Sequence, residues 1–210
     1  MVTLDDLAID GKSTAMMVVD VVKDILEDRF RYDQIGWDRT LMRAMVHGPM
    51  RNAIARFKNK LTLIYVNSEY GRDQFKGDPY PIENFCVKGT QGAEFYLLDP
   101  ADANHRYSKQ HWSALLEQPY EKGKPTELTN WLRSKGIKSL IICGVTFTHC
   151  ISKNIDHAVE LGFDVVLPRD LVASRKDRMH GEDGHLANLK KYELHPRIRV
   201  VNSEGIYIRG

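Results

Sequence analysis

The chain has 210 residues, 42% hydrophobic and 28% charged, a composition typical of a globular protein and unlike that of a disordered or fibrous one. Its 30 Lys and Arg residues nearly balance its 28 Asp and Glu residues, and the net charge of +2 argues against nucleic acid or an anionic membrane as partner. No segment reaches the ~20 apolar residues of a membrane span. The length fits a single domain over residues 1–210.

Short apolar runs alternate with helical patterns in the first half of the chain. Residues 14–22 and 61–68 are apolar without strict alternation, and each predicts a buried strand. Between them, apolar residues at helical spacing predict one helix over 37–47 and another over 49–60, separated at Gly48 and Pro49. Glycines and prolines indicate a loop region over 70–92.

The second half continues this alternation. The patterns predict strands over 106–110, 139–145, 163–168 and 197–202, and helices over 111–117, 125–135, 149–161 and 182–192. The chain is therefore expected to be a three-layer α/β fold with a mostly parallel sheet and helices on both faces. Because ligands bind beyond the carboxyl ends of such strands, functional residues are expected just after Val19, Ser68, Val145 and Leu167.

The three cysteines form no Cys-x-x-Cys pair, and the N-terminal segment has no apolar signal region. Both features predict reduced thiols in a cytoplasmic protein. Cys86 and Cys143 are expected in the core. Cys150 follows the strand 139–145 by a short turn and begins a helix, where the helix dipole and backbone N–H groups would favour a thiolate and bind an oxyanion. The alternative is that Cys150 is a small buried residue of the core.

Two charged residues are candidates at the same edge of the sheet. Asp20 ends a buried run, where it either caps the following helix or acts as a base. Lys109 lies at the end of the strand 106–110 and is either solvated or stabilises a neighbouring thiolate.

His180 and His185 are spaced unsuitably for a helical metal pair. The chain has no Gly-x-Gly-x-x-Gly segment and no Walker loop, so no nucleotide cofactor is expected.

Four segments, taken in their order along the chain, can be compared with the sequence motifs of known families. They are MMVVDVVKDIL with Asp20 and Asp24, CVKGTQGAEF, RYSKQHWSAL with Lys109, and IICGVTFTHCISKNIDHAVELGF with Cys150. Together they resemble the isochorismatase-like cysteine hydrolase superfamily, which includes nicotinamidases and N-carbamoylsarcosine amidohydrolases. The resemblance extends over most of the chain.

The resemblance implies a six-stranded parallel sheet with a catalytic triad of Asp20, Lys109 and Cys150 at its carboxyl edge. It also implies a cis peptide bond between Val145 and Thr146, and an oxyanion hole made by the backbone N–H groups of Thr146 and Cys150. The implied function is a cysteine-dependent amidohydrolase. It would cleave a linear C–N bond of a small amide or urea-type substrate through a thioester intermediate, without a cofactor and as a homo-oligomer.

Three side chains are expected to contact the substrate, namely Phe147, Tyr70 and Trp112. The Asp-x-His metal site of nicotinamidases has no counterpart in NSEYGRDQF, so no metal is expected. Two alternatives stay open. One is an isochorismate-type vinyl ether hydrolase, which would use the acid and the lysine without Cys150. The other is a non-catalytic or redox-sensing member, in which Cys150 is only an oxidisable thiol.

Overall fold

The computed structural model describes residues 6–77, 83–119, 123–175 and 182–209. Its centre is a seven-stranded parallel sheet with the order β4-β3-β2-β5-β6-β8, in which the two-residue β7 pairs with β5. The strands of this sheet are β2 (Thr14–Val19), β3 (Thr62–Ser68), β4 (His105–Lys109), β5 (Ser139–Val145), β6 (Asp164–Pro168), β7 (Val172–Ala173) and β8 (Ile198–Val201). The predicted α/β fold is confirmed, with β7 as a strand beyond the expected six.

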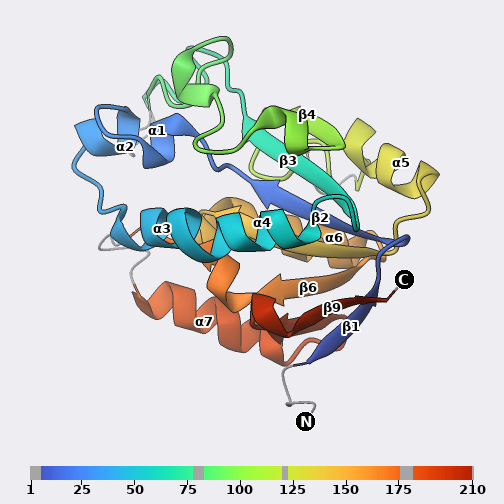
Figure 1. Cartoon of the computed structure of the whole chain (residues 1–210). Helices are drawn as coiled ribbons and strands as arrows, with labels where there is room; N and C mark the ends of the chain where they lie inside the picture. The colour runs from blue at the N-terminus through green and yellow to red at the C-terminus, as the bar shows by residue number, and fades with distance from the viewer. Residues whose placement is uncertain (1–5, 78–82, 120–122, 176–181, 210) are drawn as a thin grey trace.

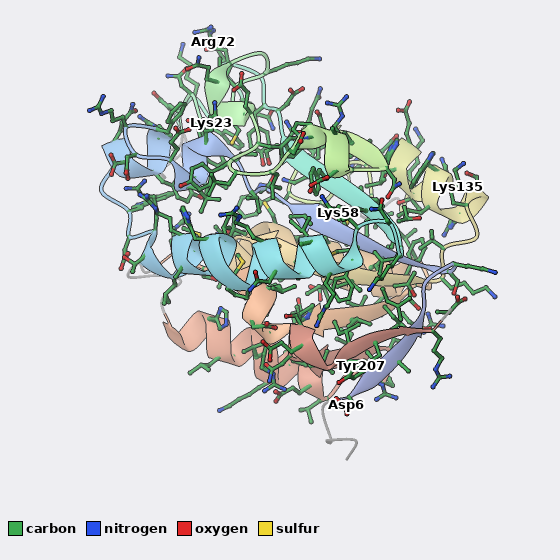
Figure 2. The ribbon with its side chains drawn as sticks, in the orientation of Figure 1. Asp6, Lys23, Lys58, Arg72, Lys135 and Tyr207 are labelled. Atoms are coloured by element: carbon green, nitrogen blue, oxygen red, sulfur yellow. The ribbon has the colours of Figure 1, made fainter. Side chains whose placement is uncertain are left out.

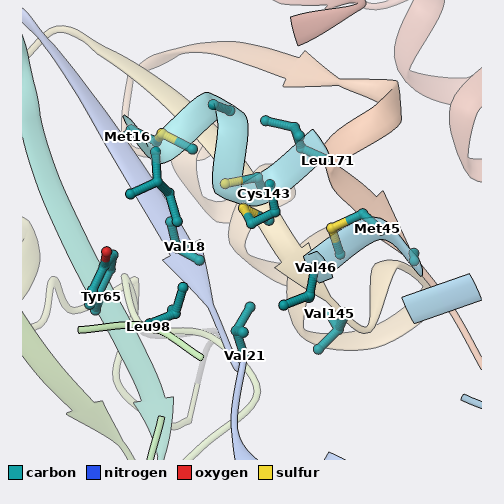
Figure 3. Close-up of a cluster of buried hydrophobic side chains, with 14 of the residues drawn as sticks. Met16, Val18, Val21, Met45, Val46, Tyr65, Leu98, Cys143, Val145 and Leu171 are labelled. Carbon is teal, nitrogen blue, oxygen red and sulfur yellow. The ribbon is translucent and has the colours of Figure 1, made fainter. Parts of the chain in front are cut away.

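Helices cover both faces of the sheet, which explains why its central strands are apolar without alternation. On one face, α3 (Thr40–Met45) and α4 (Arg51–Phe57) pack in a cluster that includes Met16, Val18 and Cys143 (Figure 3). The other face is covered by α5 (Glu127–Ser134), α6 (Ser152–Glu160) and α7 (Glu182–Glu193). Figure 1 shows these layers, with the short helices α1 (Lys23–Leu26) and α2 (Arg31–Gln34) beside the sheet.

The predicted separation of two helices at Gly48 and Pro49 is wrong. The chain stays helical there, because the π-helical turn Val46–Met50 joins α3 directly to α4. In a regular α-helix the proline ring would clash with the carbonyl four residues earlier, whereas a wider turn accommodates it. The buried Val46 and Met50 keep this turn against the sheet.

The predicted helix over 111–117 is absent as well, since this segment has no helical turn. Its backbone groups bind elsewhere. The Ala114 N–H donates to the side chain of Asn154, the Leu115 carbonyl accepts from the Thr126 N–H, and Leu116 forms an antiparallel bridge with Pro125. These tertiary contacts replace the local hydrogen bonds that a helix would have made.

A second, two-stranded parallel sheet pairs β1 (Leu7–Asp10) with β9 (Ile206–Arg209) and was not predicted. Figure 1 shows the two strands side by side below the main sheet. Figure 2 shows Arg72 and Lys135 at different parts of the outline and Lys23 within it. Among the residues that the structure describes, no helix is long and apolar enough to cross a membrane.

Candidate active site

Three of the predicted side chains come together at the carboxyl edge of the sheet. Asp20 directly follows β2, Lys109 is the last residue of β4, and Cys150 follows β5 within the π-helical turn Phe147–Ile151. The Nζ atom of Lys109 lies 2.9 Å from Asp20 Oδ2 and 3.4 Å from Cys150 Sγ. Functional residues were also expected after Leu167, near the end of β6. The acid that follows this strand, Asp170, accepts hydrogen bonds from Ser203 instead.

The acid and the lysine form a buried ion pair, since each side chain is only 1% exposed. Burial by itself lowers the pKa of the Lys109 ammonium, but Asp20 and then Cys150 outweigh it and hold that pKa well above its usual value. A buried pair of this kind is stable only if hydrogen bonds satisfy its remaining polar atoms. The ammonium therefore stays charged beside the thiol.

Ser68 supplies the hydrogen bonds that this ion pair needs, and the sequence interpretation did not identify it. Its hydroxyl donates to Asp20 Oδ1 at 2.9 Å, accepts from Lys109 Nζ at 2.6 Å and lies 3.0 Å from the hydroxyl of Tyr70. Ser68 is the last residue of β3, at one of the strand ends where functional residues were expected. Its position at the end of a strand was the only sequence feature that could have identified Ser68 as a functional residue, because serine is common at strand ends.

The backbone at Asp20 has an unusual conformation that depends on a glycine in the next strand. Asp20 has a φ of 56°, and its N–H donates to the carbonyl of Val66 at 2.8 Å. On β5, a Cβ atom at Gly144 would lie 2.1 Å from the carbonyl oxygen of Val19. Only glycine permits this close approach of the two strands below the acid.

The expectation that the position of Cys150 favours a thiolate is wrong for the free site. Burial raises the pKa of its thiol to about 12, with Lys109 lowering it and the Asp20 carboxylate raising it. Cys150 is the fourth residue of its helical turn, at the end of the first turn, where the dipole effect has already weakened. The resting side chain is therefore a neutral thiol next to a carboxylate that can accept its proton.

We expect Cys150 to be alkylated before the other two cysteines, because Cys86 and Cys143 are both 0% exposed while Cys150 is partly accessible. Burial raises the pKa of the Cys86 and Cys143 thiols as well, so neither has a compensating advantage. Mass spectrometry after brief, sub-saturating treatment with iodoacetamide measures the order of labelling. Labelling of Cys86 or Cys143 first would contradict this assignment.

The Val145–Thr146 peptide bond is cis, as the resemblance implies. Of the expected substrate contacts, Tyr70 lies next to the ion pair, with its ring centre 5.7 Å from Lys109 Nζ. Trp112 is 37% exposed, and its ring is 4.9 Å from that of His149, the neighbour of Cys150.

Phe147 departs from the expectation. It is 0% exposed and belongs to the hydrophobic cluster under α5, α6 and α7, with its ring against those of His185 and Tyr192. The π-helical turn directs this side chain into the apolar layer between the sheet and α7. Phe147 is therefore a core residue rather than a substrate contact.

The second acid, Asp24, has a structural role. Its carboxylate accepts hydrogen bonds from the N–H groups of Cys86 at 2.6 Å and Arg31 at 3.3 Å. A Cβ atom at Gly92, the last residue of KGTQG, would lie 2.3 Å from this carboxylate. Asp24 thus connects α1 to the segment that carries this motif, which explains why the motif needs its glycine.

The donor set does not fit the Asp-x-His metal site of nicotinamidases. Within residues 6–77, 83–119, 123–175 and 182–209, no three His, Cys, Asp or Glu side chains gather as a metal-binding group. His180 lies outside the described residues, and the ring of His185 packs 4.8 Å from that of Phe147.

Comparison with known proteins places these residues in a family context. Residues 14–196 match the family model of the isochorismatase domain. The chain is 31% identical over 108 residues to the nicotinamidase/pyrazinamidase of Mycobacterium tuberculosis (strain ATCC 25618 / H37Rv), a match over 48% of this chain and 57% of that protein. The chain thus spans less than two thirds of the length of that relative.

Two further proteins are similar over more of the chain. A protein of Arabidopsis thaliana named a probable inactive nicotinamidase is 25% identical over 179 residues, which are 80% of this chain and 85% of that protein. The crystal structure of PnC1 from L. infantum in complex with nicotinate has a TM-score of 0.76 at 21% identity, and covers 97% of this chain and 100% of its own. The structural likeness supports the fold alone.

Proposed function

The chain belongs to the isochorismatase family, and from this premise we propose that it is a cysteine amidohydrolase that cleaves a linear C–N amide or carbamoyl bond of a small molecule. The observation that carries the proposal is the position of Lys109 Nζ, 2.9 Å from Asp20 Oδ2 and 3.4 Å from Cys150 Sγ. These three groups supply a nucleophile, a proton acceptor and a fixed positive charge, which acyl transfer through a thioester requires.

The first half-reaction forms the thioester. As the sulfur of Cys150 attacks the substrate carbonyl carbon, the thiol proton moves to Asp20, and Lys109 stabilises the negative charge that develops on sulfur. The backbone N–H groups of Thr146 and Cys150 bind the carbonyl oxygen as it becomes an oxyanion. The C–N bond then breaks, and Asp20 transfers its proton to the leaving amine or ammonia.

The second half-reaction hydrolyses the thioester. Asp20 takes a proton from a water molecule, whose oxygen attacks the acyl carbon, and the sulfur of Cys150 leaves and receives that proton from Asp20. The products are an acid and the amine or ammonia released in the first half-reaction, and the enzyme returns to its starting state. Ser68 keeps the acid oriented through both steps, since its hydroxyl donates to Asp20 Oδ1. Tyr70 and Trp112 are the proposed substrate contacts.

The raised pKa of the Cys150 thiol fits this order of events. A neutral thiol next to a carboxylate needs no separate base, and the proton transfer occurs only when a carbonyl is present to accept the sulfur. A redox-sensing role would favour a thiolate in the free protein, whereas burial raises this pKa to about 12. A vinyl ether hydrolase would need no contact between the lysine and the sulfur.

Release of ammonia from a panel of small primary amides, ureas and N-carbamoyl compounds tests the proposal. We expect the untreated protein to release ammonia from at least one class, and the protein alkylated at Cys150 to release none. Equal release by the alkylated protein would refute a thiol-dependent reaction. The same panel would also narrow the substrate class.

Turnover should not depend on a metal, because the residues that hold one in nicotinamidases have no counterpart after β3, where NSEYGRDQF contains no histidine. Dialysis against a strong chelator is expected to leave ammonia release unchanged. Loss of activity that added zinc or iron restores would contradict this prediction. Metal content before and after dialysis is the matched measurement.

Three further parts of the proposal concern the protein as a whole. We take residues 1–210 as one hydrolase domain, because β1 and β9, near opposite ends of the chain, pair with each other. We place the reaction in the cytoplasm, since Cys86, Cys143 and Cys150 are all free thiols. We also expect a homo-oligomer, as the family resemblance implies.

A further inference from the structure

The lysine and the nucleophile meet although their strands are not neighbours. In the order β4-β3-β2-β5, the strand that carries Lys109 and the strand that leads to Cys150 are separated by β3 and β2. At a spacing of ~4.8 Å between strands, their backbones are ~14 Å apart. The hydrogen bonds of the sheet therefore do not connect these two backbones directly, and their relative position depends on other contacts.

One fully buried side chain makes that connection. Asn154, in α6, is 0% exposed and its Nδ2 donates to the carbonyl of Cys150 at 2.7 Å. The same Nδ2 lies 3.4 Å from the carbonyl of Trp112, and Oδ1 accepts from the N–H of Ala114 at 2.9 Å. The segment Trp112 to Ala114 begins three residues after Lys109. A single amide thus joins the backbone of the nucleophile to the backbone that continues from the lysine.

The partners of this amide determine its orientation. Nδ2 faces two carbonyl oxygens and Oδ1 faces one N–H, so an exchange of the two atoms would break all three contacts. A polar amide buried without partners destabilises the fold, whereas a leucine would fill similar space without that cost. The value of an asparagine here lies in the geometry of its hydrogen bonds.

We propose that Asn154 is a positioning residue that keeps the Cys150 turn and the segment after Lys109 at the separation where the ammonium contacts the sulfur. This inference rests on the proposed roles of Lys109 and Cys150. In this role Asn154 determines whether Lys109 contacts Cys150, although the Asn154 side chain touches neither the sulfur nor the ammonium.

Asn154→Ser is the sharpest variant. A serine hydroxyl at this helical position can still donate to the carbonyl four residues earlier, that of Cys150, but it is too short to reach Trp112 and Ala114. Thr129→Val is the matched control. Thr129 is also 0% exposed, and its hydroxyl donates to the carbonyl of Leu115 at 2.7 Å. The control thus removes a buried hydrogen bond to Leu115, the residue that follows the segment Trp112 to Ala114, without a link to Cys150.

The measurement is the effect of Lys109→Ala on the rate at which Cys150 is alkylated at one fixed pH, in three backgrounds; because only the thiolate reacts, this rate falls ~10-fold for each unit by which the thiol pKa of Cys150 rises. In the unchanged chain, loss of the ammonium should raise this pKa by ~1 unit or more. The same rise is expected with Thr129→Val, and less than about half of it with Asn154→Ser, because interacting residues are not additive. Alkylation needs no substrate, so the result is independent of turnover.

The outcomes separate the two proposals. An equal rise in the Asn154→Ser background would overturn the positioning role while leaving the proposed function intact. An equal reduction by Thr129→Val would overturn it too, since general loosening would then explain the effect. No rise in the unchanged chain would overturn the contact on which both depend. If Asn154→Ser does not fold, Asn154→Gln, which keeps the amide but displaces it by one methylene, takes its place with the same expected reduction.

Discussion

Asp20→Asn should abolish turnover while the fold is retained. The amide has the shape of the carboxylate and can still accept from the Ser68 hydroxyl, which is 2.9 Å from Asp20 Oδ1 in the unchanged protein. It cannot take a proton from the thiol or from water. A positioned acid or base contributes ~10²–10⁴-fold, and here one group serves both half-reactions, so the loss should reach at least the upper part of that range. Ammonia release measures it.

The thiol pKa of Cys150 distinguishes this role from a structural one. Asp20 raises that pKa and Lys109 lowers it. Asp20→Asn should therefore lower the pKa, and Lys109→Ala should raise it, although both variants lose activity. Alkylation rates of the variants and of the unchanged protein at one fixed pH report both shifts, because only the thiolate reacts. Shifts in the opposite directions would mean that the three groups are wrongly assigned.

Asp24→Asn is the matched control for the acid. Asp24 is 7% exposed, and its carboxylate accepts from the N–H groups of Cys86 and Arg31. Its replacement removes a second buried acid from the same segment without touching the sulfur. We expect a lower melting temperature with an unchanged thiol pKa at Cys150. An equal pKa shift would show that the effect of Asp20→Asn is not specific.

Cys150→Ser should lose turnover by a factor on the order of 10³ to 10⁶, the range seen when a covalent nucleophile is removed from a preformed site. A serine hydroxyl is a much weaker nucleophile than a thiol at neutral pH. Cys143→Ser is the matched control, because it makes the same chemical change at a buried position. The Cys143 thiol donates to the carbonyl of Met17 at 3.6 Å, and a hydroxyl can do the same.

These two variants also separate the competing functions. If Cys150→Ser keeps its activity on a substrate while Asp20→Asn loses it, the chain is a vinyl ether hydrolase rather than an amidase. If no compound in the panel is turned over and peroxide oxidises Cys150 selectively, the redox-sensing alternative is favoured. Ammonia release that Cys150→Ser abolishes and Cys143→Ser preserves is the result that the proposed mechanism requires.

Local sequence patterns predicted the strands of the main sheet other than β7 closely, because burial on both faces demands uninterrupted apolar runs such as TAMMVV and SLIICGV. They failed where distant parts of the chain decide the conformation. The predicted helix over 111–117 is absent since Asn154 and Thr126 bind its backbone groups. The β1–β9 pair was missed because its partners are about 200 residues apart in sequence, and neither strand has a distinctive pattern.

For the site, the sequence determined which chemical groups are present and that each follows or ends a strand, since parallel strands bring their carboxyl ends to one edge. The identity of Asp20, Lys109 and Cys150 as candidates followed from that rule and from the resemblance. Only the tertiary structure decided their environment. It buried the ion pair, added Ser68 between its members, turned Phe147 into the core and raised the pKa of the Cys150 thiol to about 12. Charge and burial act through distances between residues far apart in the chain, and no local pattern encodes those distances.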